Sequence, residues 1–332
     1  MGPTGMLRRG FLIAAGLAAA WPAAAVYAQD AAADFPSRAL RIVSPHSAGG
    51  LGDTFARLIA QHLSARFGQA VIVENRPGAS EAIGAQAAAR AAPDGYTILF
   101  ATDTGMISNL ATRKNLPYDP VRDFAPLAML LRTPLYLVVH PSLNVRSVGE
   151  LIALAKAQPG KLTYASIGTG SVQHLAGVML QSQAKVNLVH VPYKGSGPAT
   201  VDLVAGQVNL MFQGGASALP HVRSGKLLGL GSTGRARTAA TPNLPTMVEA
   251  GLPDYELSSW FGLFVPAGVP RPIIDKLNRE VVELLRAPAT REKYASFGIE
   301  ITPSTPDELG EQMRKDIPFW TRLIRDAGIE PE

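Results

Sequence analysis

The sequence has no cysteine among its 332 residues. This excludes disulfide frameworks, thiolate metal sites, cysteine nucleophiles and the lipid anchor that bacterial lipoproteins carry on a cysteine. Charged residues make up only 17% of the chain and aromatic residues 7%, and the basic residues form no cluster despite the formal charge of +5. Scattered basic residues with few aromatics are not typical of nucleic-acid binding, so we expect no nucleic-acid partner.

Long apolar runs are also missing. The run Phe11–Ala20 is shorter than the roughly 20 apolar residues that a membrane-spanning helix needs. It follows Arg8-Arg9 and precedes the small-residue segment Val26–Ala28, an arrangement typical of an export signal. We therefore predict that residues 1–28 are a signal peptide cleaved after Ala28 and that the protein is periplasmic. The twin-arginine and the general secretory routes both stay open.

Short apolar runs alternate with amphipathic stretches along most of the chain. From Phe55 to Leu63 the apolar residues share one helical face, with Asp53 as the predicted N-cap and Gly68 as the predicted end. The predicted strands are Leu40–Ser44, Val71–Glu74, Tyr96–Phe100, Leu135–Val139, Leu162–Ala165, Leu188–Val191, Val208–Phe212, Leu227–Gly231 and Ser258–Val265. This alternation predicts an α/β fold of mainly parallel sheets flanked by helices.

Two proline-containing segments, around Arg132–Leu135 and Tyr255–Ser259, indicate where the chain crosses between two lobes. We expect residues 29–133 plus 258–332 to form the first lobe and residues 134–257 the second. Such a clamshell is the type II-like architecture of periplasmic binding proteins, and the ligand cleft lies between its lobes. Capture would then occur by hinge closure.

Loops that follow predicted strands contain glycines and hydroxyl residues, which suit a ligand held by backbone N–H groups and helix N-termini. The same residue types build ordinary tight turns, so only the four loops together favour a binding site. The candidate residues are His46, Ser47, Ala48, Gly49 and Gly50; Thr102, Asp103 and Thr104; Ser166, Gly168, Thr169, Gly170 and Ser171, with His174 on the next helix; and Lys194. With little charge among them, these loops predict reversible capture of a carboxylate.

Enzyme alternatives have weaker patterns. Ser166, His174 and Asp202 could be imagined as a hydrolytic triad, but no G-x-S-x-G motif is present. Gly49–Gly52 followed by Glu74 is reminiscent of a dinucleotide site, but the glycine spacing is wrong. The six histidines have no H-x-x-x-H spacing. We predict no enzyme, cofactor or metal, and keep an exported hydrolytic or dinucleotide-dependent enzyme as the alternative.

Several segments resemble one known family. They are Val73–Gly78, Ala92–Thr97, Leu116–Pro120, His190–Gly195 and Trp260–Gly262. In order and spacing, the chain from about Phe35 onward is similar to the Bug-type receptors, the extracytoplasmic solute-binding proteins of tripartite tricarboxylate transporters.

The resemblance implies a two-lobed periplasmic binding protein that delivers a small organic acid to a membrane partner of one large and one small subunit. We expect the receptor itself to be a monomer. It also implies that Pro45–Gly50 and Thr102–Thr104 hold a carboxylate, while Ser166–Ser171 and Gln213 meet the other end of the ligand. A sensor without its own transporter remains the alternative within the family.

The sequence departs from the family pattern at three places. His46 replaces an aromatic residue, Ser80-Glu81 replaces a Gly-Gly-Asn-like stretch, and Gln213 stands where Asp is common. An Asp at that position can pair with an ammonium group, whereas Gln cannot supply the charge. We therefore hypothesise a ligand without an amino group, such as a di- or aromatic carboxylate.

Overall fold

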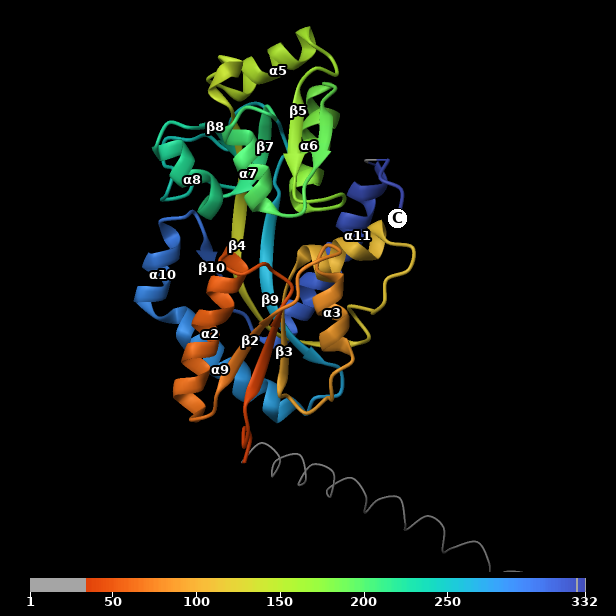
Figure 1. The fold of residues 1–332 in the computed structure, drawn as a ribbon, viewed down its shortest axis with the longest axis vertical. Helices are drawn as coiled ribbons and strands as arrows, with labels where there is room; N and C mark the ends of the chain where they lie inside the picture. The colour runs from red at the N-terminus through yellow and green to blue at the C-terminus, as the bar shows by residue number, and fades with distance from the viewer. Residues whose placement is uncertain (1–33, 327, 332) are drawn as a thin grey trace, which may run out of the picture.

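The structure is a computed structural model, and it describes residues 34–326 and 328–331. The predicted signal peptide lies outside the described residues. Figure 1 shows two lobes stacked along the long axis of the molecule and joined by two long strands. Among the helices of the described part, none has the length and apolarity to cross a membrane.

The first lobe begins with a parallel three-stranded unit. Strand β1 (Leu40–Ser44) lies between β2 (Val71–Asn75) and β3 (Thr97–Thr102). Helices α2 (Leu51–Phe67) and α3 (Ala82–Ala89) connect these strands, and a single π-helical turn, η1 (Thr104–Ser108), leads into α4 (Asn109–Thr112). These strands agree with the predicted ones to within two residues at each end, because each contains a short apolar run; β1 and β3 are largely buried, whereas β2 is not.

Helix α2 shows how the local sequence sets its own limits. Phe55, Ile59 and Leu63 are fully buried, as the predicted stripe requires, and Gly68 ends the helix in the left-handed region at φ 65°. The predicted N-cap is wrong: the helix begins at Leu51, and Asp53 lies inside the first turn. From there its carboxylate accepts the N–H of Gly49 at 2.9 Å, which satisfies a donor that precedes the helix.

The second lobe contains β5 (Thr163–Ser166), β6 (Val189–Pro192), β7 (Leu210–Gly214) and β8 (Leu228–Ser232). Strand β5 runs parallel to both β6 and β7. The helices of this lobe are α5 (Val148–Ala157), α6 (Val172–Ala184), α7 (Ser196–Val204) and α8 (Gly215–Arg223), with the 3-10 turn η2 (Pro141–Leu143) before α5. Helix α5 is capped by Ser147, whose Oγ accepts the N–H of Glu150 at 3.1 Å.

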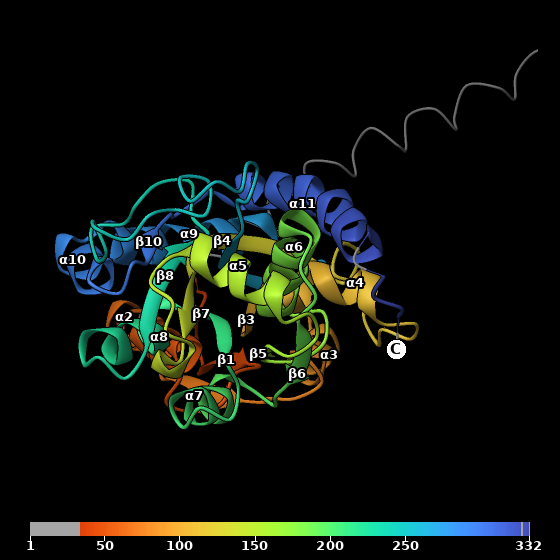
Figure 2. The same ribbon diagram turned by 90° about the horizontal axis from the view of Figure 1, so that it is seen from above.

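The chain then returns to the first lobe through β9 (Ser258–Pro266), which pairs antiparallel with β3. It continues through α9 (Arg271–Arg286), α10 (Pro288–Ala295), β10 (Glu300–Ile301) and α11 (Pro306–Asp326). Helix α11 packs against β4, η1 and α4, and Figure 2 shows it beside β4 and α4. The antiparallel strands make the sheet mixed rather than parallel throughout.

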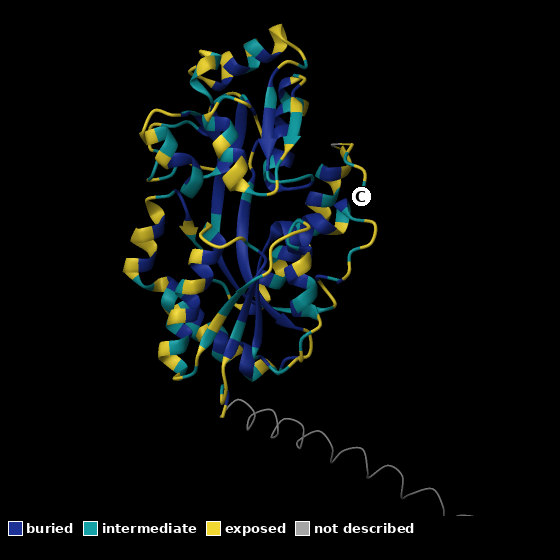
Figure 3. Ribbon diagram, viewed as in Figure 1, coloured by how far each residue is buried: buried dark blue, intermediate teal, exposed yellow. Residues whose placement is uncertain are grey.

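One long strand, β4 (Phe124–Val139), belongs to both lobes. Its residues up to Pro134 pair with β9, and those from Leu135 onward pair with β7 and β8. Figure 3 shows β4 and β9 buried along most of their length. The sequence predicted only the last third of β4, because Pro126 and Pro134 argue against a strand. The structure places them at a register shift and at the change of partners.

The pairing directions determine which loops meet. The carboxyl ends of β1, β2 and β3 point toward the crossing strands, since Thr102 at the end of β3 pairs with Phe261 near the start of β9. In the second lobe, β7 ends at Gly214 opposite Leu135, and β5 and β6 run in the same direction. The loops after these strands therefore face one another across the crossing, and we call them the facing loops.

Candidate ligand site

His46, in the first facing loop, packs its ring against two aromatic side chains. The ring centroid lies 5.6 Å from that of Phe100 and 5.8 Å from that of Phe261, the second contact being stacked. Its Nε2 lies 3.4 Å from a carboxylate oxygen of Glu81. A side chain at Gly52 would collide with the imidazole, so glycine makes room for it. His46 thus fills the volume of an aromatic residue and adds a polar edge, while Ser47, Ala48, Gly49 and Gly50 are exposed.

Glu81 was not among the predicted ligand residues, yet it contacts two of them, His46 and Thr102, and we call these three residues the first-lobe site. Its carboxylate accepts the N–H of Thr102 at 3.0 Å and also the Thr102 hydroxyl. The side chain is only 10% exposed. Ala79, Ser80 and Glu81 have φ of 48°, 50° and 75°, a left-handed run that is costly for residues with a Cβ. Glycine and asparagine, which the family pattern leads one to expect here, adopt this conformation more easily.

Asp103 turns away from the facing loops. Its side chain is fully buried and accepts hydrogen bonds from Ser259 Oγ at 3.0 Å and from the N–H of Trp260 at 3.2 Å. Burial, assisted by the nearby charge of Glu81, raises the pKa of Asp103 to about 8. Asp103 therefore ties the end of β3 to β9. Thr104 is buried as well and donates its N–H to Thr102 Oγ1 at 3.1 Å.

In the second lobe, the Ser166–Ser171 loop is held by its own hydroxyl groups. Ser166 Oγ accepts the N–H of Gly168 at 3.1 Å. Ser171 Oγ donates to the carbonyl of Gly168 at 2.7 Å and caps α6 by accepting the N–H of His174 at 3.3 Å. Gly168 and Gly170 have φ of 136° and 76°, which explains the glycines at these two positions. Thr169 lies between them and is partly buried.

Behind this loop lies a stack of three rings. The ring of His190 stacks on those of Tyr164 and His174, with centroid distances of 4.9 Å and 3.9 Å, and the rings of Tyr164 and His174 are 6.2 Å apart. His190 Nε2 is 2.6 Å from Ser166 Oγ, and His174 Nδ1 accepts the N–H of Gly170 at 3.1 Å. Burial lowers the pKa of both histidines to about 4, and for His174 the neighbouring His190 adds to the effect. Both imidazoles are therefore neutral at neutral pH.

The hydrogen bonds around the stack do not form the hydrolytic triad of Ser166, His174 and Asp202. The hydroxyl of Ser166 pairs with His190 rather than with His174. Asp202 accepts a hydrogen bond from the Tyr193 hydroxyl at 2.7 Å. His190, which was not among the predicted ligand residues, contacts the predicted ligand residue Ser166 directly.

Two predicted residues differ sharply in burial. Lys194 is exposed. Gln213 is only 1% exposed, and its amide nitrogen donates to Thr200 Oγ1 while its amide oxygen has no partner among the described residues. A buried polar atom without a partner carries a free-energy cost that a bound hydrogen-bond donor would remove.

The two sets of facing loops approach closely. A Cβ added at Gly168 would lie 3.7 Å from Ser80 Oγ, and one at Gly170 would lie 2.5 Å from the Thr112 side chain. Second-lobe residues predicted to hold ligand thus lie directly opposite the loop that carries Glu81.

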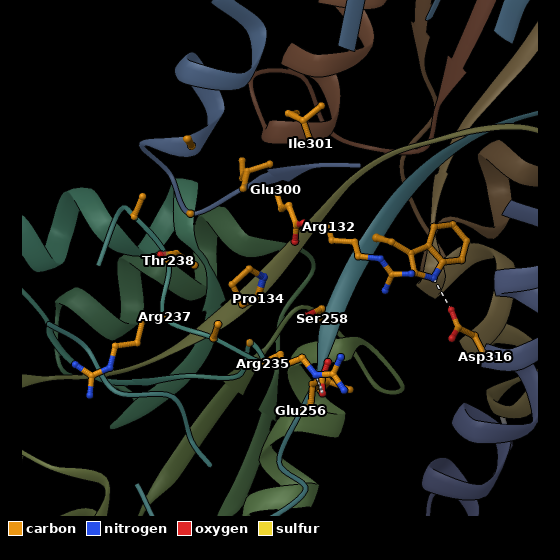
Figure 4. Close-up of a pocket in the computed structure, with 18 of the residues that line it drawn as sticks. Arg132, Pro134, Arg235, Arg237, Thr238, Glu256, Ser258, Glu300, Ile301 and Asp316 are labelled. Carbon is orange, nitrogen blue, oxygen red and sulfur yellow. Dashed lines mark hydrogen bonds and ion pairs between the residues drawn. The ribbon is translucent and has the colours of Figure 1, made fainter. Parts of the chain in front are cut away.

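A cavity of about 1250 Å³ lies elsewhere, between the lobes on the other face of β9 (Figure 4). Its walls include Arg132, Arg235 and Glu300, and Trp260 donates its indole N–H to Asp316 at 2.8 Å. None of the predicted ligand residues is among its lining residues. Its arginines and acidic residues are balanced in sign, and Arg235 lies 3.6 Å from Glu256, so it lacks the charge bias expected of a carboxylate site.

Comparisons with known proteins show the family and the fold of the chain. Residues 55–329 match the family model described as "Tripartite tricarboxylate transporter family receptor". A structure from R. palustris with adipate has a TM-score of 0.86 and 34% identity, covering 90% of this chain and all of that one. The periplasmic binding protein BugD gives 0.83 and 33%, covering 90% and 100%. MatC from Rhodopseudomonas palustris with bound malate gives 0.80 and 32%, covering 87% and 100%. The predicted fold class, a two-lobed α/β solute-binding protein, is confirmed.

Proposed function

Because the chain belongs to the family of tripartite tricarboxylate transporter receptors, we propose that it captures a small organic carboxylate between its lobes and delivers it to such a transporter. Membership confirms the resemblance noted in the sequence and the prediction of a receptor rather than an enzyme. The observation that supports capture best is the meeting of the strand-end loops of both lobes at Gly168 and Ser80. The adipate and malate found with similar structures support the ligand class.

The proposed ligand lies between the facing loops. Closure would bend the two crossing strands near Thr133–Leu135 of β4 and Ser258 of β9, where β4 exchanges β9 for β7 and β8. Residues 29–133 and 258–332 would move as one lobe and residues 134–257 as the other. On the second lobe, Gln213 has no charge that could pair with an ammonium group. This supports a ligand that lacks an amino group at this end, such as a di- or aromatic carboxylate.

The proposed location is the periplasm, after removal of residues 1–28. This agrees with the family and with the periplasmic binding protein BugD among the similar structures. The proposed partners are the large and small membrane subunits, and the receptor would act as a monomer. A sensing role without a transporter is the second candidate within the same ligand chemistry.

A thermal-shift screen of residues 29–332 tests the proposal. The panel would contain mono-, di-, tri- and aromatic carboxylates, amino acids, and NAD as the control for a dinucleotide enzyme. A ligand at 100 times its Kd stabilises the folded state by about 2.7 kcal/mol, which shifts Tm by a few degrees. A shift with one carboxylate class and no turnover supports a receptor. A panel with no carboxylate response, or a response to NAD alone, would overturn it.

A further inference from the structure

Glu81 places a carboxylate of the protein itself against the donors of the first-lobe site. Its oxygens accept both the N–H and the hydroxyl of Thr102, and one of them lies 3.4 Å from His46 Nε2. A carboxylate that arrived from solution would find these donors already in use.

The surroundings are built for this side chain. A Cβ at Gly105 would lie 2.6 Å from Glu81 Oε2, so glycine leaves the space that the carboxylate fills. Asn109 donates to the carbonyl of Ser80 at 2.8 Å, which anchors the left-handed segment that aims Glu81 inward. Moving Glu81 aside would break its two bonds with Thr102 inside a site that is mostly shielded from water.

Two of the ionisable groups around Glu81 carry no positive charge. Asp103 and Tyr118 lie near it, and its charge raises the pKa of both, with burial as the larger cause in each case. His46 offers a single Nε2 at 3.4 Å. The first-lobe end of the site is therefore negative or neutral, and two carboxylates a few ångströms apart at low dielectric repel strongly.

We infer that Glu81 is a specificity-determining residue that makes this receptor prefer ligands with a single carboxylate over dicarboxylates of the same length. This inference rests on the proposed function, since the ligand must lie between the facing loops. A ligand with a single carboxylate can place that group at the Ser166–Ser171 loop of the second lobe. A dicarboxylate must place its second charge beside Glu81. This replaces the dicarboxylate option of the proposed ligand class with aromatic or aliphatic monocarboxylates.

The test compares matched ligand pairs by isothermal titration calorimetry on the purified protein: hexanoate with adipate, and benzoate with terephthalate. The variant Glu81→Gln keeps an amide oxygen for the Thr102 donors and removes the charge. The matched control is Glu292→Gln, the same change at an exposed carboxylate of α10. We expect the wild type to prefer each monocarboxylate. In Glu81→Gln the dicarboxylate should gain at least about tenfold in affinity, or roughly 1.4 kcal/mol, relative to its partner.

The outcomes separate the two proposals. Equal or tighter binding of dicarboxylates by the wild type, or an unchanged ratio in Glu81→Gln, overturns the role of Glu81 and leaves the receptor function standing. If the affinity ratio shifts equally in Glu292→Gln, the cause is the net charge of the protein rather than a local effect of Glu81. That outcome also overturns the role of Glu81. If neither protein binds any member of either pair while the thermal-shift panel finds another carboxylate ligand, the role of Glu81 is overturned and the receptor function stands; if no carboxylate binds at all, both proposals fail.

Discussion

Two carboxyl groups at the end of β3 have contrasting surroundings. Glu81 accepts two hydrogen bonds from Thr102 beside His46, whereas Asp103 is buried against β9 and its pKa is raised to about 8. Burial therefore favours the protonated form of Asp103 near neutral pH. The sequence predicted Asp103 as a ligand residue and left Glu81 without a role. In the structure Glu81 contacts Thr102 and His46, whereas Asp103 is bonded to Ser259 and Trp260 of β9.

Replacing Asp103 by Asn should change how stability depends on pH. A carboxyl group whose pKa is higher in the folded state than in the unfolded state keeps its proton on folding, so its stabilisation is lost as pH rises toward 8. We expect the wild-type free energy of unfolding to fall by about 1–2 kcal/mol between pH 6.5 and 8.5, measured by urea denaturation. Asp103→Asn should flatten this slope even if it lowers stability overall. The control Asp34→Asn, at an exposed carboxyl, should keep the wild-type slope, and an unchanged slope in Asp103→Asn would contradict the assignment.

The hydroxyls of the second-lobe loop provide a second prediction for individual residues. If Ser166 and Thr169 contact the ligand, the double replacement Ser166→Ala, Thr169→Ala should cost about 1–3 kcal/mol of binding free energy. Calorimetry with whichever carboxylate binds the wild type measures the loss. Ser142→Ala is the matched control, because Ser142 bonds only with His140 and Asn144 near η2. Unchanged affinity in the double variant would move the ligand away from this loop.

Residue roles in the site could be predicted only where they follow from local pattern. Glycines at 168 and 170 follow from turns that need positive φ, and Ser171 follows from helix capping. The role of Glu81 depends on a left-handed segment that no propensity favours and on space at Gly105, distant in sequence. The role of His190 depends on its stacking with His174, which requires the pairing of β5 with β6 and the packing of α6. Such contacts arise from tertiary structure.

At the scale of elements, short buried strands were predicted and the longest one was not. Strands β1 and β5 have apolar runs that identify them, and the stripe on α2 identifies its buried face. Strand β4 contains two prolines, and its two halves pair with different neighbours. Local sequence rules describe a strand with one set of partners, so they divided β4 at the point where its partners change.

The ring stack that joins β5, β6 and α6 should make the second lobe sensitive to acid. His174 and His190 have pKa values near 4 when folded, below their unfolded values, so the folded state takes up protons less readily. Their stabilising effect is complete above about pH 6.5 and is lost as pH falls toward 4. We expect a loss of about 2–4 kcal/mol over this range from the pair, partly offset by Asp103, whose contribution has the opposite sign.

Urea denaturation between pH 7 and 4.5 measures this loss. His190→Gln retains a hydrogen-bonding group near Ser166 but removes one titrating ring, so its stability should depend less on pH. His221→Gln, on α8 away from the stack, is the control and should follow the wild type. Parallel pH curves for the wild type and His190→Gln would show that the stack does not govern acid sensitivity.

Across the whole molecule, β9 separates two regions between the lobes. Neighbouring residues of a strand point to opposite faces, and Phe261 stacks on His46 while Trp260 lines the cavity of Figure 4. Asp103 accepts the N–H of Trp260, whose indole in turn donates to Asp316 on α11. Bending about β4 and β9 that brings the facing loops together must therefore widen the cavity on the other face.

Bulk placed in this cavity should consequently tighten ligand binding. Ala236→Trp adds a large side chain to a cavity wall, and it should destabilise the open form, in which the walls approach, more than the closed form. Since ligand affinity scales with the fraction of molecules in the closed form, we expect Kd to fall by about threefold or more. Calorimetry measures Kd, and small-angle X-ray scattering without ligand should show a smaller radius of gyration. Ala153→Trp, at an exposed position of α5, is the control and should change neither quantity. Weaker or unchanged binding by Ala236→Trp, with scattering like the wild type, would mean that the lobes do not move about the β4–β9 crossing.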